Sequence, residues 1–170
     1  TWGGFANGTA SPYLNTGSVY DPSGPTWTAT TATGAPPVRA MHTAVWNGSE
    51  MFIFGGYNGT AALNTGFAYK PAPSEAWRAL ATLNAPSIRS GHTAVHINKR
   101  MLIWGGVNGA SYTSTGGRYN ILTDLWESMP SQSAPAPRAN HTAVVINGKM
   151  IVWGGNSAIH YFNTGGVYTP

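Results

Sequence analysis

Short apolar runs alternate with glycine-rich joints along this chain, and one arrangement occurs three times in full. Each copy has an apolar run after a histidine, a turn, a second apolar run and a glycine doublet. The histidines are His42, His92 and His141, and the first glycine of each doublet follows 13 residues later. A threonine then follows that glycine by 10 residues in every copy. Insertions therefore fall outside the apolar runs, which indicates that the runs are the structural units.

The runs predict strands, because they are short and rich in β-branched and aromatic residues. No longer segment has the 3.6-residue period of a helix, so we expect no helices. Asn-Gly at 47–48 and 147–148 predicts tight hairpin turns, since both turn positions need a positive φ. Each copy thus reads as a four-stranded antiparallel meander. The expected strands of the two complete copies cover residues 42–46, 51–54, 67–69 and 76–80, and residues 92–97, 101–104, 117–119 and 125–126.

The glycine doublets sit at the end of the second strand of each copy. Glycine in a strand costs about 0.5–1 kcal/mol relative to alanine. Its repeated use here therefore predicts a close backbone approach or a positive φ. A tyrosine in the third strand and a tryptophan in the fourth supply large apolar faces that can pack on neighbouring sheets.

A glycine doublet, then Tyr, then Trp, on four short strands per ~50 residues, resembles the kelch repeat of β-propellers. The resemblance implies an all-β fold, a β-propeller of four-stranded antiparallel kelch-type blades, with about 3.5 repeats in this chain. The matching residues are Gly3, Gly4, Tyr20 and Trp27; Gly55, Gly56, Tyr69 and Trp77; Gly105, Gly106, Tyr119 and Trp126; and Gly154, Gly155 and Tyr168.

We expect a single kelch propeller segment over residues 1–170. It divides into a partial blade at 1–30, full blades at 39–80 and 89–128, and a blade lacking its last strand at 138–170. An open arc of blades exposes sheet faces and edges. This favours further propeller blades from the same longer chain, and a ring completed by a second copy is the alternative.

Composition narrows the functional classes. The net charge of +4 comes from few acids, and the Lys and Arg residues are scattered, which argues against a nucleic-acid partner. No apolar run approaches the ~20 residues of a membrane span. There is no cysteine, and only 8% of residues are charged. High Gly, Thr and Asn with few charges is typical of an extracellular or cell-envelope, secreted protein.

Each repeat opens with Arg-x-x-His, which gives the pairs Arg39/His42, Arg89/His92 and Arg138/His141. Three imidazoles could bind a metal, and the arginines could clamp a carboxylate. The structural alternative is that each pair binds a loop carbonyl and fixes the step from one blade to the next. We favour architecture, because the pair recurs in every blade, and we expect no metal site and no cofactor.

Nothing in the sequence forms a catalytic constellation. The five acids, Asp21, Glu50, Glu75, Asp124 and Glu127, are expected away from the propeller axis, with no pair placed for acid–base chemistry. Galactose oxidase, on a kelch-like propeller, uses a cysteine-crosslinked tyrosine at its copper site, and this chain has no cysteine. We therefore expect a non-enzymatic module. The alternatives are the propeller part of a carbohydrate-active enzyme with catalytic residues outside this stretch, and a purely structural scaffold.

The loops between second and third strands share one face with the connections between blades. In kelch proteins that face resembles a ligand platform, which implies binding of a protein or carbohydrate ligand. Tyr, Asn and Arg on supported loops suit polar recognition; the alternative is that they are solvated loop tips. The candidate ligand-binding residues are Tyr13, Tyr57, Asn58, Asn108, Tyr112, His160 and Tyr161, with Arg39, Arg89 and Arg138 at the inner rim.

Overall fold

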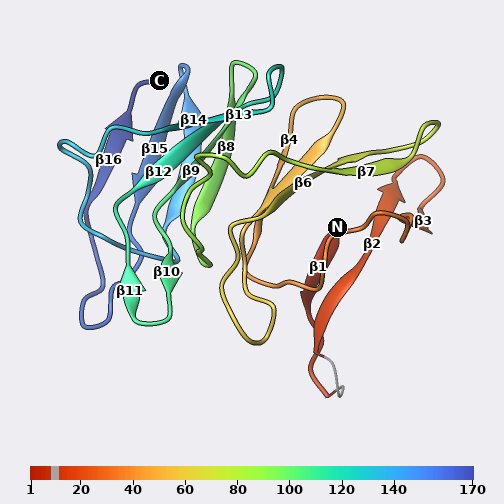
Figure 1. The fold of residues 1–170 in the computed structure, drawn as a ribbon, viewed down its shortest axis with the longest axis horizontal. Helices are drawn as coiled ribbons and strands as arrows, with labels where there is room; N and C mark the ends of the chain where they lie inside the picture. Colours follow the sequence, from red (N-terminus) through yellow and green to blue (C-terminus); the bar gives the residue numbers. More distant parts are fainter. Residues whose placement is uncertain (9–11) are drawn as a thin grey trace.

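Four antiparallel sheets of three or four strands follow one another along the described part of the chain and fan outward without closing into a ring (Figure 1). The computed structural model describes residues 1–8 and 12–170. Every regular element in this part of the chain is a strand, as the apolar pattern predicted. Accordingly, the described residues include no helix able to cross a bilayer. The predicted all-β fold of four-stranded antiparallel sheets is confirmed in this part of the chain.

We name the sheets blades I to IV in chain order. Blade I contains three strands, blades II and III four each, and blade IV three, with every neighbouring pair antiparallel. The strands are β1 (Trp2–Phe5), β2 (Tyr13–Asp21) and β3 (Thr26–Ala29) in blade I; β4 (Thr43–Trp46), β5 (Met51–Phe54), β6 (Gly66–Lys70) and β7 (Ala76–Ala79) in blade II; β8 (Thr93–Ile97), β9 (Arg100–Trp104), β12 (Gly116–Asn120) and β13 (Leu125–Ser128) in blade III; and β14 (Thr142–Ile146), β15 (Lys149–Trp153) and β16 (Gly165–Tyr168) in blade IV.

One strand pair was not predicted. The loop between β9 and β12 forms a small hairpin of β10 (Val107–Asn108) and β11 (Ser111–Tyr112). Two residues per strand are too few to show an alternating pattern. The only local signal was the dipeptide Asn108-Gly109, which is typical of turns.

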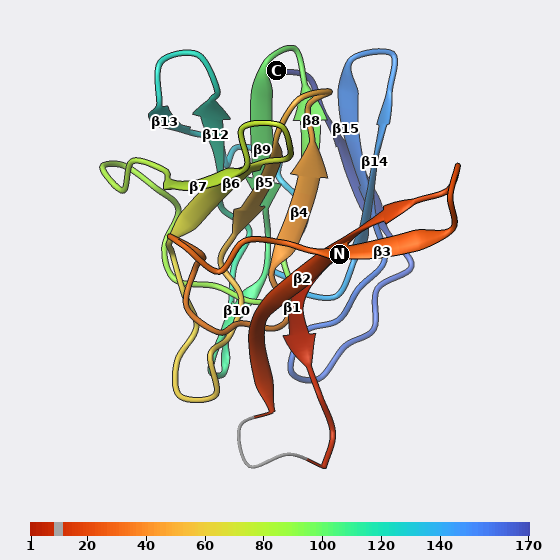
Figure 2. The same cartoon turned by 90° about the vertical axis from the view of Figure 1, so that its right-hand side faces the viewer.

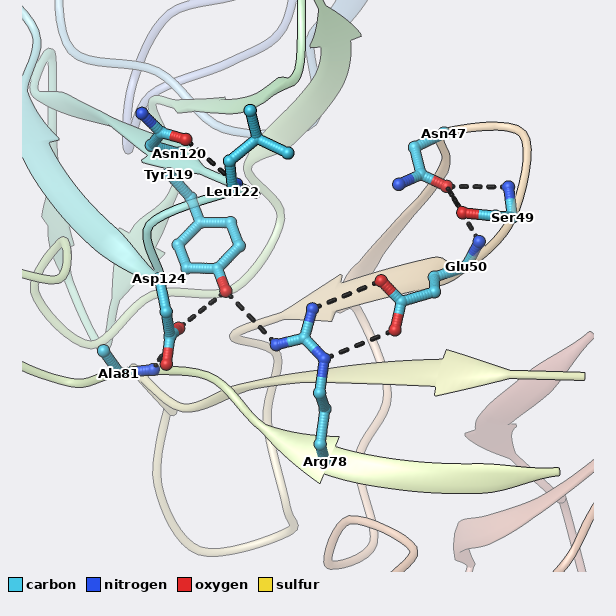
Figure 3. Close-up of polar contacts among 9 residues, drawn as sticks. All are labelled: Asn47, Ser49, Glu50, Arg78, Ala81, Tyr119, Asn120, Leu122 and Asp124. Carbon is cyan, nitrogen blue, oxygen red and sulfur yellow. Dashed lines mark hydrogen bonds and ion pairs between the residues drawn. The ribbon is translucent and has the colours of Figure 1, made fainter. Parts of the chain in front are cut away.

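The β4–β5 and β14–β15 turns lie at the opposite end of the blades from the β10–β11 hairpin, and their conformations differ. In blade IV, Asn147 and Gly148 have φ of 50° and 72°, as the tight-turn prediction requires. In the β4–β5 turn of blade II only Gly48 has a positive φ, and the prediction that Asn47 also has one is wrong. The Asn47 side chain instead accepts hydrogen bonds at 2.8 Å from the backbone N–H of both Ser49 and Glu50 (Figure 3). These two hydrogen bonds stabilise a four-residue loop, residues 47–50, in place of the two-residue turn.

The hydrophobic core lies between blades rather than within them. The Trp77 ring of blade II packs 5.2 Å from the Trp2 ring of blade I, and the Trp126 ring of blade III packs 5.0 Å from Phe54 of blade II. The predicted packing of fourth-strand tryptophans on neighbouring sheets is thereby confirmed. A third cluster, around Trp104 and Met150, joins blades III and IV. Each blade is therefore stabilised mainly by its neighbours.

Candidate functional site

The loops that join the second and third strands of the blades lie at one end of the molecule, which we call the loop face. It is the lower end in Figure 1 and again in Figure 2. It carries the β1–β2, β5–β6, β9–β12 and β15–β16 connections. The β4–β5, β8–β9 and β14–β15 turns occupy the other end.

The glycine doublets form the base of these loops. Gly55 has a φ of 64° and Gly56 a φ of 97°, a region that disfavours residues with a side chain. A Cβ at Gly55 would lie 2.7 Å from Cε1 of His92 and 2.8 Å from the carbonyl oxygen of Arg89. Both reasons suggested by the sequence, a positive φ and a close approach, therefore apply. The close approach lets the N–H of Gly56 donate to the Arg89 carbonyl at 2.9 Å, which links blades II and III.

The three repeat arginines are buried, at 0–1% exposure. Nη1 of Arg89 donates to the carbonyl oxygens of Gly105 and Thr115, at 2.9 Å each, and so ties together the two ends of the loop in its own blade. Arg39 and Arg138 make the equivalent pair of bonds. Burial lowers the pKa of Arg39 and Arg89 to about 10, which leaves both protonated at pH 7.

The prediction that Arg39, Arg89 and Arg138 line the rim of a binding face is corrected by this burial. Their guanidinium groups already bind backbone carbonyls at the base of the loops, and a ligand has no access to them.

The repeat histidines connect neighbouring blades. Nε2 of His92 lies 2.8 Å from Oγ1 of Thr43 in blade II, and Nε2 of His141 lies 2.7 Å from Oγ1 of Thr93 in blade III. Burial, together with the nearby charge of Arg89, lowers the pKa of His92 to about 3, so the imidazole is neutral at pH 7. These contacts support the structural interpretation of the Arg/His pairs. Within residues 1–8 and 12–170, no group of three or more His, Asp or Glu side chains could hold a metal ion.

Tyr13 and Tyr57 brace the loops of blades I and II. The Tyr13 ring lies edge-on between the rings of Phe5, at 5.3 Å, and Tyr57, at 5.7 Å. It also covers Gly59, where a Cβ would come within 2.9 Å of the ring. Asn58 has a local role as well, since its Oδ1 accepts from the backbone N–H of Thr60 at 2.9 Å. These three candidates are half-buried and order the loops.

Tyr112 plays a comparable part between blades III and IV. Its hydroxyl accepts a hydrogen bond from Nδ2 of Asn156 at 3.4 Å, and Oδ1 of Asn156 accepts from Asn140 at 2.9 Å. Asn108, at the tip of the β10–β11 hairpin, is exposed. The structure therefore leaves Asn108 free to contact a ligand, whereas Tyr112 links the loops of blades III and IV through Asn156.

The tip of the β15–β16 loop has the most exposed candidates. Tyr161 is 94% exposed and His160 is also exposed. Sequence reasoning missed Ile159, which is 83% exposed beside them; the available signal was a large aliphatic residue in the connection between two strands. The loop is well supported, because the Ser157 N–H donates to the His160 carbonyl at 2.8 Å and the Arg138 guanidinium lies 4.2 Å from the Phe162 ring.

The acids lie toward the opposite end and have structural partners. Asp124 accepts a hydrogen bond from the Tyr119 hydroxyl at 2.6 Å, and Glu50 pairs with Arg78 at 3.3 Å (Figure 3). Glu127 pairs with Arg118 at 2.9 Å. These contacts tie strands and blades together, and they give no pair of facing carboxylates on the loop face.

The comparisons with known proteins agree with this architecture. The family model for the KLHDC2/KLHL20/DRC7 Kelch-repeats domain matches residues 1–169. A search of curated proteins found no match. Domains of this kind are generally protein-interaction modules. The match spans nearly the whole chain and accords with the inter-blade packing of Tyr and Trp described above, so the chain belongs to the kelch-repeat family.

Proposed function

We propose that the loop face binds a protein ligand and that the tip of the β15–β16 loop, Ile159 to Tyr161, is its main anchor. The observation that carries the proposal is the exposure of two large side chains, Tyr161 at 94% and Ile159 at 83%, on a hydrogen-bonded loop. Tyrosines in such positions are enriched among residues that dominate binding energy. The family's general role in protein interaction supports the same conclusion.

The neighbouring loops leave room for a ligand to reach this anchor. The tips of the β5–β6 and β9–β12 loops are Gly-Thr-Ala at 59–61 and Gly-Ala-Ser at 109–111, which are small and exposed. Beyond them, Phe5 in blade I is 58% exposed. Because Tyr13 and Arg138 already order the loops, little conformational entropy is lost on binding. The surface thus combines a rigid base, an aromatic anchor and polar tips.

Binding can be tested by substitutions at the two ends of the molecule. We expect Tyr161→Ala and Ile159→Ala each to weaken capture of a protein ligand by more than about tenfold. Leu122→Ala is the matched control, because Leu122 is 71% exposed in the β12–β13 turn at the opposite end. Photo-crosslinkers placed at residues 161 and 122 measure the same contrast directly. Equal capture by all three variants would contradict the proposal.

A carbohydrate is the other ligand class for this face, because an exposed tyrosine ring can also pack against a sugar. A glycan array probed with the wild type and with Tyr161→Ala separates the two classes. Glycan binding by the wild type that is lost in the variant would show that the ligand is a carbohydrate and not a protein. If neither assay responds to the loop-face variants, the scaffold alternative is supported instead.

We also retain an extracellular or cell-envelope location as part of this proposal. It is supported by the scarcity of charged residues, 8% of the chain, and by the abundance of Gly, with 22 residues. Fractionation of the source cells with an antibody to the loop face tests the location independently of binding.

A further inference from the structure

The connections that form the loop face carry no exposed charge. They are of two kinds, the loops between second and third strands and the connections from one blade to the next. Six of them lie entirely in the described part of the chain, at residues 30–42, 55–65, 80–92, 105–115, 129–141 and 154–164. None contains Asp, Glu or Lys, and their only arginines are the buried Arg39, Arg89 and Arg138. A ligand on these connections therefore meets amide, hydroxyl, aromatic and aliphatic groups.

The opposite end of the molecule has a different surface. Every turn between described strands there contains a charged residue or borders one at the end of a strand. These residues are Asp21, Glu50, Lys70, Glu75, Lys99, Arg100, Asp124 and Lys149. The remaining charged residues of the chain, Arg78, Arg118 and Glu127, lie on the outer strands β7, β12 and β13. The lack of exposed charge is therefore a property of the loop face and not of the whole surface.

A charged group of a ligand has no partner of opposite sign on this face. Removing a charge from water costs free energy unless an opposite charge or several hydrogen bonds replace its hydration. The three buried guanidinium groups already donate to carbonyl oxygens of their own blades. Their positive charge below the surface disfavours a cation more than an anion. The loop face therefore selects against charged ligands, and against basic ones most strongly.

Between blades III and IV, neutral side chains on this face form a short chain of hydrogen bonds. Nδ2 of Asn156 donates to the Ser157 carbonyl at 3.3 Å and to the Tyr112 hydroxyl at 3.4 Å. Oδ1 of Asn156 accepts from Nδ2 of Asn140 at 2.9 Å. Because the Ser157 carbonyl can only accept, it fixes the orientation of the Asn156 amide, and this makes Asn140 the donor.

Both ends of this chain are open to a ligand. Among the described residues, none accepts the hydroxyl proton of Tyr112 and none donates to Oδ1 of Asn140. Asn140 is exposed and Tyr112 is half-buried. Gly91 leaves the Asn140 acceptor uncovered, since a Cβ there would lie 2.9 Å from Oδ1. A free donor and a free acceptor match a carboxamide, which offers both a carbonyl oxygen and an NH₂ group.

We propose that the loop face binds an uncharged segment of its protein ligand and that Tyr112 and Asn140 bind an Asn or Gln side chain of that segment. The Tyr112 hydroxyl donates to the carbonyl oxygen of the bound carboxamide, and Oδ1 of Asn140 accepts from its NH₂ group. This inference rests on the proposed function, because it names the chemistry of the ligand for the same face. The carboxamide site itself uses neither Ile159 nor Tyr161.

Charge selectivity is tested by panning a random-peptide phage library on the immobilised chain and sequencing the enriched peptides. We expect Lys and Arg to be depleted by more than about threefold relative to the unselected library, and Asp and Glu to be depleted less strongly. A selected pool in which either class of charged residue is as frequent as in the library, or more frequent, contradicts the proposal.

Two variants of opposite charge at one exposed position of the loop face provide a matched control. Ala110 lies at the tip of the β10–β11 hairpin, and it is changed to Lys in one variant and to Glu in the other. By calorimetry, an enriched peptide should bind both variants with the wild-type affinity to within about twofold, at about 50 and 500 mM salt alike. Shifts in opposite directions would show that the ligand contact is charged, and the proposal would then be wrong.

The carboxamide contact is tested by a double-mutant cycle. Each Asn or Gln of the enriched peptide is changed in turn to Ala. Tyr112→Phe keeps the ring and should weaken the original peptide by about three- to tenfold, with little effect on the one Ala peptide that lacks the bound carboxamide. Replacing that carboxamide by a carboxylate should weaken wild-type binding at least as much as Ala does, since a carboxylate has no N–H for Asn140. Equal effects of Tyr112→Phe on all peptides would leave Tyr112 a structural role only and overturn the assignment.

Failure of this inference can be distinguished from failure of the proposed function. If Tyr161→Ala and Ile159→Ala bind the peptide as the wild type does, the proposed anchor is wrong, whereas the cycle at Tyr112 still decides the carboxamide contact. If no peptide is enriched over wells without protein, or if only neutral glycans bind on the array, both proposals are overturned.

Discussion

Blades III and IV have nearly the same residues at the base of their loops, but in different surroundings. Trp104 ends β9 at 4% exposure, because blade IV covers it, whereas Trp153 ends β15 at 58% exposure. Gly105 is pressed against His141 of blade IV, whereas the nearest atom to a Cβ at Gly154 is 3.6 Å away in its own loop. The difference shows that the repeat residues stabilise the fold through the next blade along the chain.

The largest expected effect comes from the two tryptophans at equivalent positions. Trp104→Ala should lower the free energy of unfolding by about 3–5 kcal/mol, because it empties a buried site between two blades. Trp153→Ala should lower it by less than about 1 kcal/mol, because the ring is already largely in water. Urea unfolding followed by circular dichroism measures both. Equal losses would mean that each blade is stable by itself.

Substitutions in the glycine doublets of blades III and IV should also differ in their cost to stability, by less than the two tryptophan substitutions do. In Gly105→Ala the new Cβ would lie 2.6 Å from Cε1 of His141 and 2.9 Å from the Arg138 carbonyl, at a φ of 69°. We expect a loss of about 2–4 kcal/mol from strain and displacement of blade IV. Gly154→Ala, at a φ of 72°, retains only the backbone strain and should cost about 1 kcal/mol. Thermal unfolding of the two variants side by side checks the ranking, and a larger loss at Gly154 would refute it.

Acid should weaken the contacts between blades through the buried histidines. Burial lowers the pKa of His92 to about 3 and that of His141 to about 4, so the unfolded chain takes up these protons first as the pH falls below about 6.5. Their contribution to stability is full above that pH and decreases as the pH falls toward 4. For His92 alone the decrease is on the order of 3 kcal/mol.

The pH effect is measured as the slope of the unfolding free energy between pH 7 and pH 4. His92→Gln should flatten this slope, whatever it does to stability at pH 7, because it removes one of the buried titrating groups. Leu122→Ala changes an exposed turn residue that carries no titrating group, and should leave the slope as in the wild type. A slope that is the same in all three proteins would show that the histidines are not the cause.

Much of this architecture could be predicted from residues alone, because it depends on local pattern. Period, glycine doublets and β-branched runs indicated strands that agree with β4 to β9, β12 and β13 to within two residues at each end. The β10–β11 hairpin was missed because its strands are too short to show a pattern. The turn at Asn47 was mistaken because a side-chain hydrogen bond decided its shape.

The candidate site was predicted less well, since exposure depends on what lies opposite a residue. Arg138 and Tyr161 both looked available in the sequence, yet one is 1% exposed and the other 94%. Repetition identified the Arg/His pairs as architectural. It could not show that the arginine closes its own loop while the histidine reaches the previous blade.

The sequence by itself determined the class of fold, the order of strands and the repeat that links them, because alternation and glycine placement act over a few neighbouring residues. The tertiary structure alone decided which aromatic rings are covered and which loop tip is free. Those outcomes depend on the contacts between blades, and residues at the same place in the repeat meet different neighbours at different steps of the arc.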